Sequence, residues 1–313
     1  MKHQRWLDDN IADMSGKVVV ITGANSGIGF FAAQYLAQKG ATVVMACRSL
    51  DKGRAAAETI LSNHPSAKLD VLRYDQASYA AIRSFLDELK SKYKRIHALV
   101  LNAGIFHPDA HAKTAEGSPL TIGTNFLGLY YLLRKGMPFF DQGNPQTRII
   151  FVSSLVAATT KMKNFSFLTE EKGGAYHQYC LSKTSIDKFF SVLANGVNLY
   201  DFPERKNICF TLMHPGVSNT NIIHSYPPGL RRAGHFVLSA FTHSPETACL
   251  GIVYLAGAQH VYNGSVYAPR GPFEISGLPM KTQLPRHIGR GSGQFIYEVG
   301  HLVSRLEKGE DNA

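Results

Sequence analysis

Short apolar runs rich in β-branched residues alternate along this chain with longer stretches in which apolar residues recur at helical spacing. Several runs are apolar throughout, which is typical of parallel strands buried on both faces. Seven strands are predicted, beginning near Lys17, Ala41, Lys68, His97, Thr147, Asn207 and Gly264. The alternation predicts an α/β protein with a single Rossmann-type, doubly wound parallel sheet of about seven strands and helices on both faces.

The chain has no internal repeat, low-complexity tract or obvious linker. Its 313 residues could form one large domain or two small ones, and the continuous alternation favours a single domain over 1–313. Two irregular stretches, 155–178 and 219–245, mix Pro, Gly, Ser and aromatic residues. The charged tail, 307–313, is predicted to be frayed.

Composition indicates a soluble globular protein, with 44% hydrophobic and 18% charged residues. The four cysteines lack metal-like spacing, and Cys47 and Cys209 fall in predicted strands, which favours buried free thiols in a reducing compartment. The first residues lack the apolar stretch of a signal peptide, and no uncharged apolar run reaches the ~18 residues of a spanning helix. A cytoplasmic protein is therefore expected.

The formal net charge of +10 leaves several partners open. Phosphates of a small ligand would account for a few cations, and nucleic acid or an anionic membrane could attract the rest. However, the basic residues are scattered, without the aromatic-interleaved clusters of a nucleic-acid groove. We expect no nucleic-acid binding and at most peripheral membrane contact.

A glycine-rich turn, TGANSGIG (22–29), follows the first predicted strand and opens the first helix. Gly23 can adopt backbone angles that a side chain forbids, and Gly27 and Gly29 let the backbone approach a pyrophosphate and let helix pack on strand. The free N–H groups of the helix N-terminus then face the phosphates. Such a triplet can be only a tight turn, but its place after the first strand predicts a dinucleotide site.

Tyrosine precedes lysine by four residues at three places: Tyr35/Lys39, Tyr131/Lys135 and Tyr179/Lys183. Residues four apart share a helix face, so any such pair can be a partly buried ring beside a solvated amine. That interpretation suits Tyr35, in the helix after the glycine turn, and Tyr131, in an apolar helix. Only Tyr179 follows a strand that ends in two serines, Ser153 and Ser154, and this context selects the third pair.

Taken in order, these features resemble the short-chain dehydrogenase/reductase family. LNAG (101–104), TNFLG (124–128), the two serines, YCLSK (179–183) and HPGVSNT (214–220) match its motifs over about residues 15–270. The resemblance implies the catalytic residues Asn125, Ser154, Tyr179 and Lys183. It implies cofactor contacts from Gly23, Asn25, Ser26, Gly27, Ile28, Gly29, Asp75, Asn102, Ala103, Gly104, Tyr179, Lys183, Pro215, Gly216, Val217 and Thr220.

The end of the second strand predicts which dinucleotide binds. Arg48 lies 19 residues beyond Gly29, about where the residue that reads the adenosine ribose is expected. An acidic residue there would bond the 2′-hydroxyl of NAD, whereas an arginine suits the 2′-phosphate of NADP. Asp51 is nearby but is better interpreted as a helix-start residue. We therefore expect NADP(H) to be preferred, with a solvated loop arginine as the alternative.

The chemistry follows from the tyrosine and lysine. A tyrosine with pKa ≈ 10 is a poor base at pH 7, and the positive charge of Lys183 one helical turn on would lower that pKa. The resemblance implies that Ser154, rather than Ser153, bonds the substrate oxygen, and that Asn125 distorts its helix and holds a water linking the lysine to solvent. Tyr179 would then act as acid in reduction and as base in oxidation.

One departure concerns the substrate. Ser154 and Tyr179 are 25 residues apart, about twice the separation in many relatives. This gap, with MACRSLDKG, TAEG and YAPRGPFEISGLP, resembles the retinol dehydrogenase, WW-domain oxidoreductase and protochlorophyllide reductase branch. We expect 155–178 and 219–245 to form the substrate site. Phe165, Phe167 and Leu168 would line it for a lipophilic carbonyl or alcohol, or simply seal the insertion onto the core.

Two other functions stay open: reduction of a carbon–carbon double bond, as in the pigment-reducing relatives, and NADPH sensing without turnover. No metal is expected, because His107 and His111, although four apart, flank Pro108 in a predicted loop and lack a third ligand. His214 is expected to pack under the nicotinamide loop. The helices that carry Asn125 and Tyr179 often pair subunits in the family, so a homodimer or homotetramer is one expectation.

Overall fold

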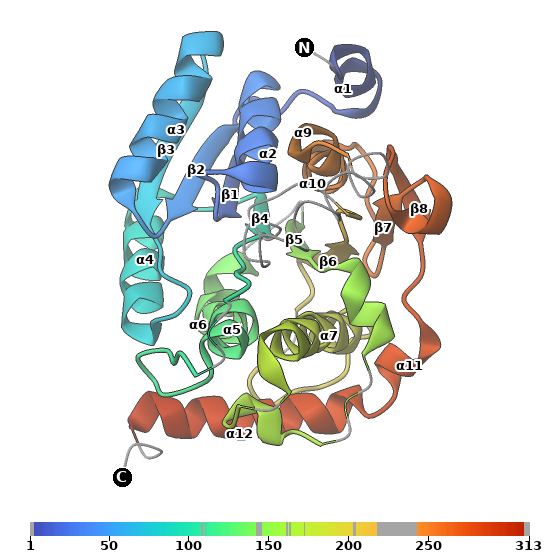
Figure 1. The fold of residues 1–313 in the computed structure, drawn as a ribbon. Helices are drawn as coiled ribbons and strands as arrows, with labels where there is room; N and C mark the ends of the chain where they lie inside the picture. Colours follow the sequence, from blue (N-terminus) through green and yellow to red (C-terminus); the bar gives the residue numbers. More distant parts are fainter. Residues whose placement is uncertain are drawn as a thin grey trace.

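The computed structural model describes residues 3–107, 109, 111–141, 146–160, 162, 164–171, 173–202, 205–217 and 243–309. Within these ranges the chain forms one eight-stranded sheet with helices on both faces (Figure 1). The strands are β1 (Val18–Thr22), β2 (Thr42–Cys47), β3 (Lys68–Arg73), β4 (Ala98–Leu101), β5 (Thr147–Val152), β6 (Ile208–Met213), β7 (Val266–Pro269) and β8 (Pro279–Thr282).

The strand order is β3-β2-β1-β4-β5-β6-β7-β8, and every neighbouring pair is parallel except β7 and β8. All seven predicted strands are present, so the fold class is confirmed. The prediction lacked β8, an antiparallel edge strand of four residues. Its Met280 and Lys281 are exposed, so it has no buried apolar run to signal it. The order reverses between β1 and β4, where ligands bind in open α/β sheets.

The helices form two layers on the sheet. The first comprises α2 (Gly27–Gln38), α3 (Leu50–Asn63), α9 (Pro245–Ala248) and α10 (Leu250–Gly257), with α1 (Gln4–Asn10) beside it. The second comprises α4 (Tyr79–Lys92), α5 (Leu120–Ile122), α6 (Gly128–Phe140) and α7 (Gly174–Ala194) (Figure 1). Alternate strand residues supply the two cores, because successive side chains point to opposite faces: Val19 and Ile21 face the first layer and Val20 the second.

Beyond β8, α11 (Arg286–Gly289) leads into α12 (Ser292–Lys308), which lies across the outer side of α7 (Figure 1). Phe295, Val299 and Val303 of α12 are fully buried. Near the end of α12, the Glu307 carboxylate forms an ion pair with the Lys135 ammonium group of α6, with the nitrogen and oxygen 2.6 Å apart. Glu307 and Lys308, which the prediction placed in the frayed tail, are the last two residues of α12. Residues 310–313 lie outside the described ranges.

Candidate active site

The glycine turn has the geometry of a phosphate cradle. Gly23 and Gly27 have φ of +69° and +56°, a region that residues with a side chain rarely adopt. A Cβ at Gly29 would lie 2.5 Å from the Gly23 carbonyl oxygen and 2.6 Å from the Asn102 side-chain nitrogen. The first turn of α2 then begins at Gly27 without an acidic residue or a side-chain cap. These features fit an anionic dinucleotide.

Hydrogen bonds from Asn102 and Thr22 hold this turn against the end of β4. The Thr22 hydroxyl accepts the backbone N–H groups of Asn102 (3.0 Å) and Ala103 (2.9 Å), and it donates to the Val100 carbonyl (3.1 Å). The Asn102 amide donates to the Thr22 carbonyl at 2.8 Å. The Asn102 side chain therefore holds the glycine turn in place.

We expect Gly29→Ala to lose dinucleotide binding, because its methyl group would collide with the Gly23 carbonyl and displace the turn. Overpacking of this kind also costs about 1–3 kcal/mol of folding stability. Fluorescence titration with NADPH and thermal unfolding would measure both effects. Gly293→Ala, where no atom lies within 4 Å of the added carbon, is the matched control. Wild-type affinity in Gly29→Ala would contradict the cradle.

Arg48 follows β2 directly, and its side chain is exposed. Within the described ranges no ion pair or hydrogen bond engages its guanidinium. Asp51 lies in the first turn of α3, behind the Ser49 N-cap, which confirms its interpretation as a helix-start residue. The carboxylate of Asp75 accepts the N–H of Ala77 at 3.0 Å, a local turn contact that leaves its second oxygen for other partners.

Asn125 lies in a π-helical turn, Gly123–Leu127, between α5 and α6. Such single turns are rare and occur mostly at functional sites. The fully buried Asn125 side chain accepts the Ile105 N–H at 2.7 Å, and it donates to the Ile105 carbonyl at 2.8 Å and to the Ser182 hydroxyl at 3.0 Å. It thereby joins the helix distortion to the loop after β4 and to α7.

Tyr179 and Lys183 lie one turn apart on the buried face of α7. The Lys183 ammonium nitrogen is 6.0 Å from the centre of the Tyr179 ring, and it donates to the Val152 carbonyl at 3.1 Å. A Cβ at Gly104 would meet the Asn125 oxygen at 3.4 Å and the Lys183 nitrogen at 3.5 Å. The structure thus brings Asn125 and Lys183 together near Gly104, just beyond the carboxyl end of β4.

The two serines after β5 have different surroundings. Ser153 is buried, and its side chain faces α7 beside Asp187. Its hydroxyl has no hydrogen bond of good geometry to a described residue, so the alternative that it caps local backbone is wrong. Ser154 is half-buried. This difference favours Ser154 over Ser153 as the group that meets a substrate.

The other two tyrosine–lysine pairs are structural, as their contexts predicted. The Tyr35 hydroxyl donates to Glu246 at 2.5 Å, and burial and that carboxylate raise its pKa. Tyr131 bonds Arg83 and Glu307 and stacks on Tyr79 with ring centres 4.0 Å apart, and burial raises its pKa too. A raised pKa makes each phenol a poorer base.

Burial perturbs the charges around Lys183. It lowers the pKa of Lys183 to about 8, and the charge on Asp187 opposes this effect. Burial also raises the pKa of Asp187 to about 7, which the Ser153 hydroxyl and the Lys183 charge partly offset. Burial thus shifts both pKa values toward neutral pH, and perturbed groups of this kind cluster at functional sites.

The Pro-Gly loop, 214–217, is held by the segment before β8. The Gly216 N–H donates to His214 Nδ1 at 3.3 Å, so the ring proton sits on Nε2 and donates to Glu274 at 2.8 Å. Burial lowers the pKa of His214, which favours this neutral form. Gly216 has φ of +71°, and the Val217 N–H donates to the Ile275 carbonyl at 2.9 Å. His214 thus packs under the loop; Thr220 lies outside the described residues.

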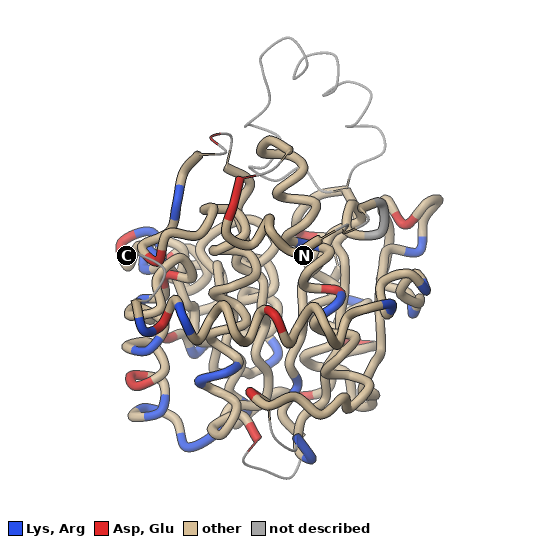
Figure 2. Tube along the Cα trace, turned by 90° about the horizontal axis from the view of Figure 1, so that it is seen from below, with Lys and Arg blue, Asp and Glu red and all other residues tan. Residues whose placement is uncertain are grey.

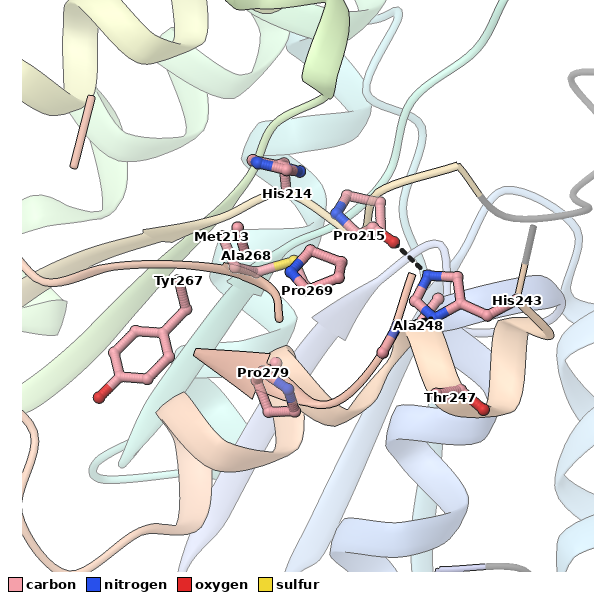
Figure 3. Close-up of a pocket in the computed structure, with 12 residues that line it drawn as sticks. Met213, His214, Pro215, His243, Thr247, Ala248, Tyr267, Ala268, Pro269 and Pro279 are labelled. Atoms are coloured by element: carbon pink, nitrogen blue, oxygen red, sulfur yellow. Dashed lines mark hydrogen bonds between the residues drawn. The ribbon is translucent and has the colours of Figure 1, made fainter. Parts of the chain in front are cut away.

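A small pocket opens beside this loop, between the ends of β6 and β7 and the start of α9 (Figure 3). His243 donates across it to the Pro215 carbonyl at 2.6 Å. None of the four catalytic candidates lines it. Its walls are Met213, His214, Pro215, His243, Thr247, Ala248, Gly251, Tyr267, Ala268, Pro269, Gly277 and Pro279.

The segment 155–178, before Tyr179, was expected to contribute apolar residues to the substrate site. Phe167 and Leu168 are buried in the core under α7, and Phe165 and Phe167 contact the Phe295 ring of α12 at 5.2 and 6.3 Å. This packing agrees with the alternative, in which these residues seal the insertion onto the core, although Phe165 is only half-buried. Their apolar character is explained by the aromatic cluster around Phe295, and α12 is too far along the chain for local patterning to pair them.

Three residues near Tyr179 and Asn125 were not predicted from the sequence. The Phe106 ring stands edge-on to Tyr179, with centres 5.9 Å apart. Gln76 is buried and donates to the carbonyls of Thr124 (2.6 Å) and Ala103 (3.2 Å), joining the ends of β3 and β4 to the π-turn. Asp187 extends the Tyr179–Lys183 row. Two sequence features could have indicated them: Phe106 follows Asn-Ala-Gly closely, and Asp187 comes four residues after Lys183.

Basic and acidic residues are mixed along the chain. Lys and Arg occur at many separate places on the trace, interspersed with Asp and Glu (Figure 2). The four cysteines are free and buried, as predicted. No helix in the described ranges has the length and apolar character to cross a membrane. Nor do the described His, Cys, Asp and Glu residues form a group of three able to hold a metal; His107 and His111 lie in a loop.

The family model "short chain dehydrogenase" matches residues 17–230. Retinol dehydrogenase 11 from Homo sapiens is 32% identical over 239 residues, which cover 74% of this chain and 70% of that protein. The WW domain-containing oxidoreductase from Gallus gallus is also 32% identical, over 68% of this chain but only half of its own length. The chain therefore belongs to the short-chain dehydrogenase family, in the retinol dehydrogenase-like branch.

Solved structures agree with this assignment. An uncharacterized protein from Mycobacterium Paratuberculosis superposes with a TM-score of 0.73 at 25% identity, covering 95% of this chain and 96% of that one. The L-sorbose reductase from Gluconobacter frateurii, solved with NADPH and L-sorbose, gives a TM-score of 0.62 at 22% identity over 80% of this chain and 93% of its own, which supports the fold alone. Both solved structures share the fold of this chain.

Proposed function

We propose that this protein is an NADP(H)-dependent oxidoreductase that interconverts a carbonyl and an alcohol, with Tyr179 as general acid or base. The observation that carries the proposal is the approach of Lys183 and Asn125 to Gly104, with Tyr179 one turn from the lysine. These groups lie at the carboxyl ends of the strands, beside the glycine turn. A proton donor and a cofactor site therefore share one edge of the sheet.

The chain's own residues handle the proton. When bound, the nicotinamide supplies or accepts the hydride. The Tyr179 hydroxyl donates its proton to the developing alkoxide in reduction and withdraws it in oxidation. A positive charge on Lys183, 6.0 Å from the Tyr179 ring centre, would favour the phenolate form of the tyrosine. Ser154 bonds the substrate oxygen, and Asn125 fixes the loop after β4 against α7.

The preference for NADP(H) rests on Arg48. Its exposed guanidinium at the end of β2 offers a bidentate partner for a 2′-phosphate. Gly23, Asn25, Ser26, Gly27, Ile28 and Gly29 would hold the pyrophosphate, with Asp75 near the adenine and the loop from Pro215 near the nicotinamide.

We propose a lipophilic substrate, a preference that rests on the name of retinol dehydrogenase 11 and on Phe106. Phe106→Ala should raise KM about tenfold for a bulky apolar aldehyde and change kcat less, because it removes apolar contact area worth about 1.4 kcal/mol. Steady-state kinetics with retinal and a short aldehyde would measure this. Tyr200→Ala, which truncates a fully exposed ring, is the control. An equal loss on both aldehydes would contradict a role in apolar recognition.

Carbon–carbon double-bond reduction is the nearest alternative, because the same tyrosine and lysine could protonate carbon. Product analysis with an enone substrate separates the two reactions. An allylic alcohol supports carbonyl reduction, and a saturated ketone would overturn it. NADPH consumption by neither class, despite tight binding, would favour a sensor.

For the cellular setting, we propose a cytoplasmic protein with at most peripheral membrane contact. A homodimer or homotetramer stays a prediction. The outer face of α7 is covered by α12 of the same chain. We therefore propose that any assembly uses a different face.

A further inference from the structure

Asp187 extends the row of functional side chains on α7. Tyr179, Lys183 and Asp187 follow one another at intervals of four residues, so each lies about one helical turn from the next on the same face. All three are buried, with exposed fractions of 8%, 5% and 3%. A carboxyl group thus stands directly behind the lysine, on the side away from the tyrosine.

The Asp187 carboxyl lies beside two polar groups, the Ser153 hydroxyl and the charge of Lys183. Its Oδ1 atom is buried without a hydrogen bond to any described residue, and so is the Ser153 hydroxyl beside it. The next residue, Lys188, does not neutralise it, because its ammonium group bonds the carbonyls of Ile288 (3.0 Å) and Arg290 (2.7 Å). Burying a carboxyl group is costly, and a buried carboxyl oxygen without a hydrogen bond calls for an explanation.

Lys183 needs such a neighbour. Among the described residues its ammonium group donates one hydrogen bond, to the neutral Val152 carbonyl, and its burial favours loss of the proton. A neutral lysine would give Tyr179 no positive charge. An opposite charge within about 4–6 Å of a buried group shifts its titration by about 1–3 pH units toward the charged form.

We propose that Asp187 is a positioning residue that keeps Lys183 in its ammonium form, with Ser153 orienting the carboxyl. The effect of this charge on Tyr179 as acid or base rests on the proposed function, whereas the effect of Asp187 on Lys183 does not. The charge on Lys183 can be followed without any substrate.

The test follows Lys183 directly by NMR titration of ¹³Cε-labelled lysine, with the resonance assigned by its absence in Lys183→Arg. Asp187→Asn should lower the Lys183 titration midpoint by about one pH unit or more. The alkaline limb of kcat/KM for carbonyl reduction should move to lower pH by a similar amount, because removing the negative charge eases proton loss from the coupled pair. Asp187→Glu should return both toward wild type.

Asp201→Asn is the matched control. The Asp201 side chain is also largely buried, with 7% of it exposed. It bonds Arg134 (3.1 Å) and Tyr130 (2.7 Å) rather than Lys183, so its loss should leave the Lys183 midpoint unchanged. If Asp187→Asn fails to fold, Ser153→Ala should give a smaller shift in the same direction. An unchanged Lys183 midpoint in the folded variant would overturn the proposal. A shifted midpoint in a protein that turns over no carbonyl would support Asp187 and overturn the proposed function alone.

Discussion

Replacing Tyr179 with phenylalanine is expected to lower kcat by about 10²–10⁴-fold, the range that general acid–base groups contribute. The variant loses only the hydroxyl that exchanges the proton. Its ring still packs edge-on against Phe106. NADPH affinity and folding stability should therefore stay close to wild type, and stopped-flow or steady-state NADPH oxidation with a carbonyl substrate would measure the loss.

Tyr131→Phe is the control for this experiment, because it removes the hydroxyl of another tyrosine that precedes a lysine by four residues. The Tyr131 hydroxyl bonds Arg83 and Glu307, so its loss should lower stability and leave kcat nearly unchanged. Full activity in Tyr179→Phe would refute the catalytic assignment. A large loss of kcat in Tyr131→Phe would show that the context used to choose between the pairs was misleading.

The second large effect is expected at Arg48. Arg48→Asp should weaken NADPH binding roughly 10–100-fold, since hydrogen bonds to charged groups contribute about 1.5–3 kcal/mol and each 1.4 kcal/mol is tenfold in affinity. The introduced carboxylate would repel the 2′-phosphate and could accept the 2′-hydroxyl of NAD, so NADH binding should hold or improve. Paired KM and Kd measurements with the two cofactors would show the reversal.

Arg54→Asp supplies the matched charge change, because Arg54 is an exposed arginine of α3, close in sequence to Arg48. It should change affinity for both cofactors equally and slightly. If wild-type protein prefers NADH, or if Arg48→Asp leaves the NADPH-to-NADH ratio unchanged, the prediction of NADP(H) specificity fails.

Most of the sheet could be predicted because its strands are buried on both faces. Val18–Thr22 and Ile208–Met213 are nearly continuous apolar runs, so burial leaves a direct trace in the sequence. The edge strand β8 and the packing of α12 lack that trace. α12 packs on α7, and this contact depends on the topology of the whole chain. A local sequence pattern does not predict it.

The candidate site divides in the same way. The glycine turn and the Tyr179–Lys183 pair are local spacings, so their positions could be predicted. The packing of Phe165 and Phe167 on Phe295, and the bond from His214 to Glu274, join segments more than 50 residues apart. The partner of Asp187 across the strand end, Ser153, is likewise set by the sheet rather than by neighbours in sequence. Such contacts follow only once the topology is known.

NADP(H)-dependent carbonyl chemistry can be tested most directly by one measurement on the purified protein. NADPH and NADH would be titrated by fluorescence, and the preferred cofactor then followed against aliphatic aldehydes, retinal, steroid ketones and quinones. We predict tighter binding of NADPH and turnover of at least one carbonyl. Binding of neither cofactor, or tight NADPH binding without turnover of any carbonyl, would contradict the proposed function.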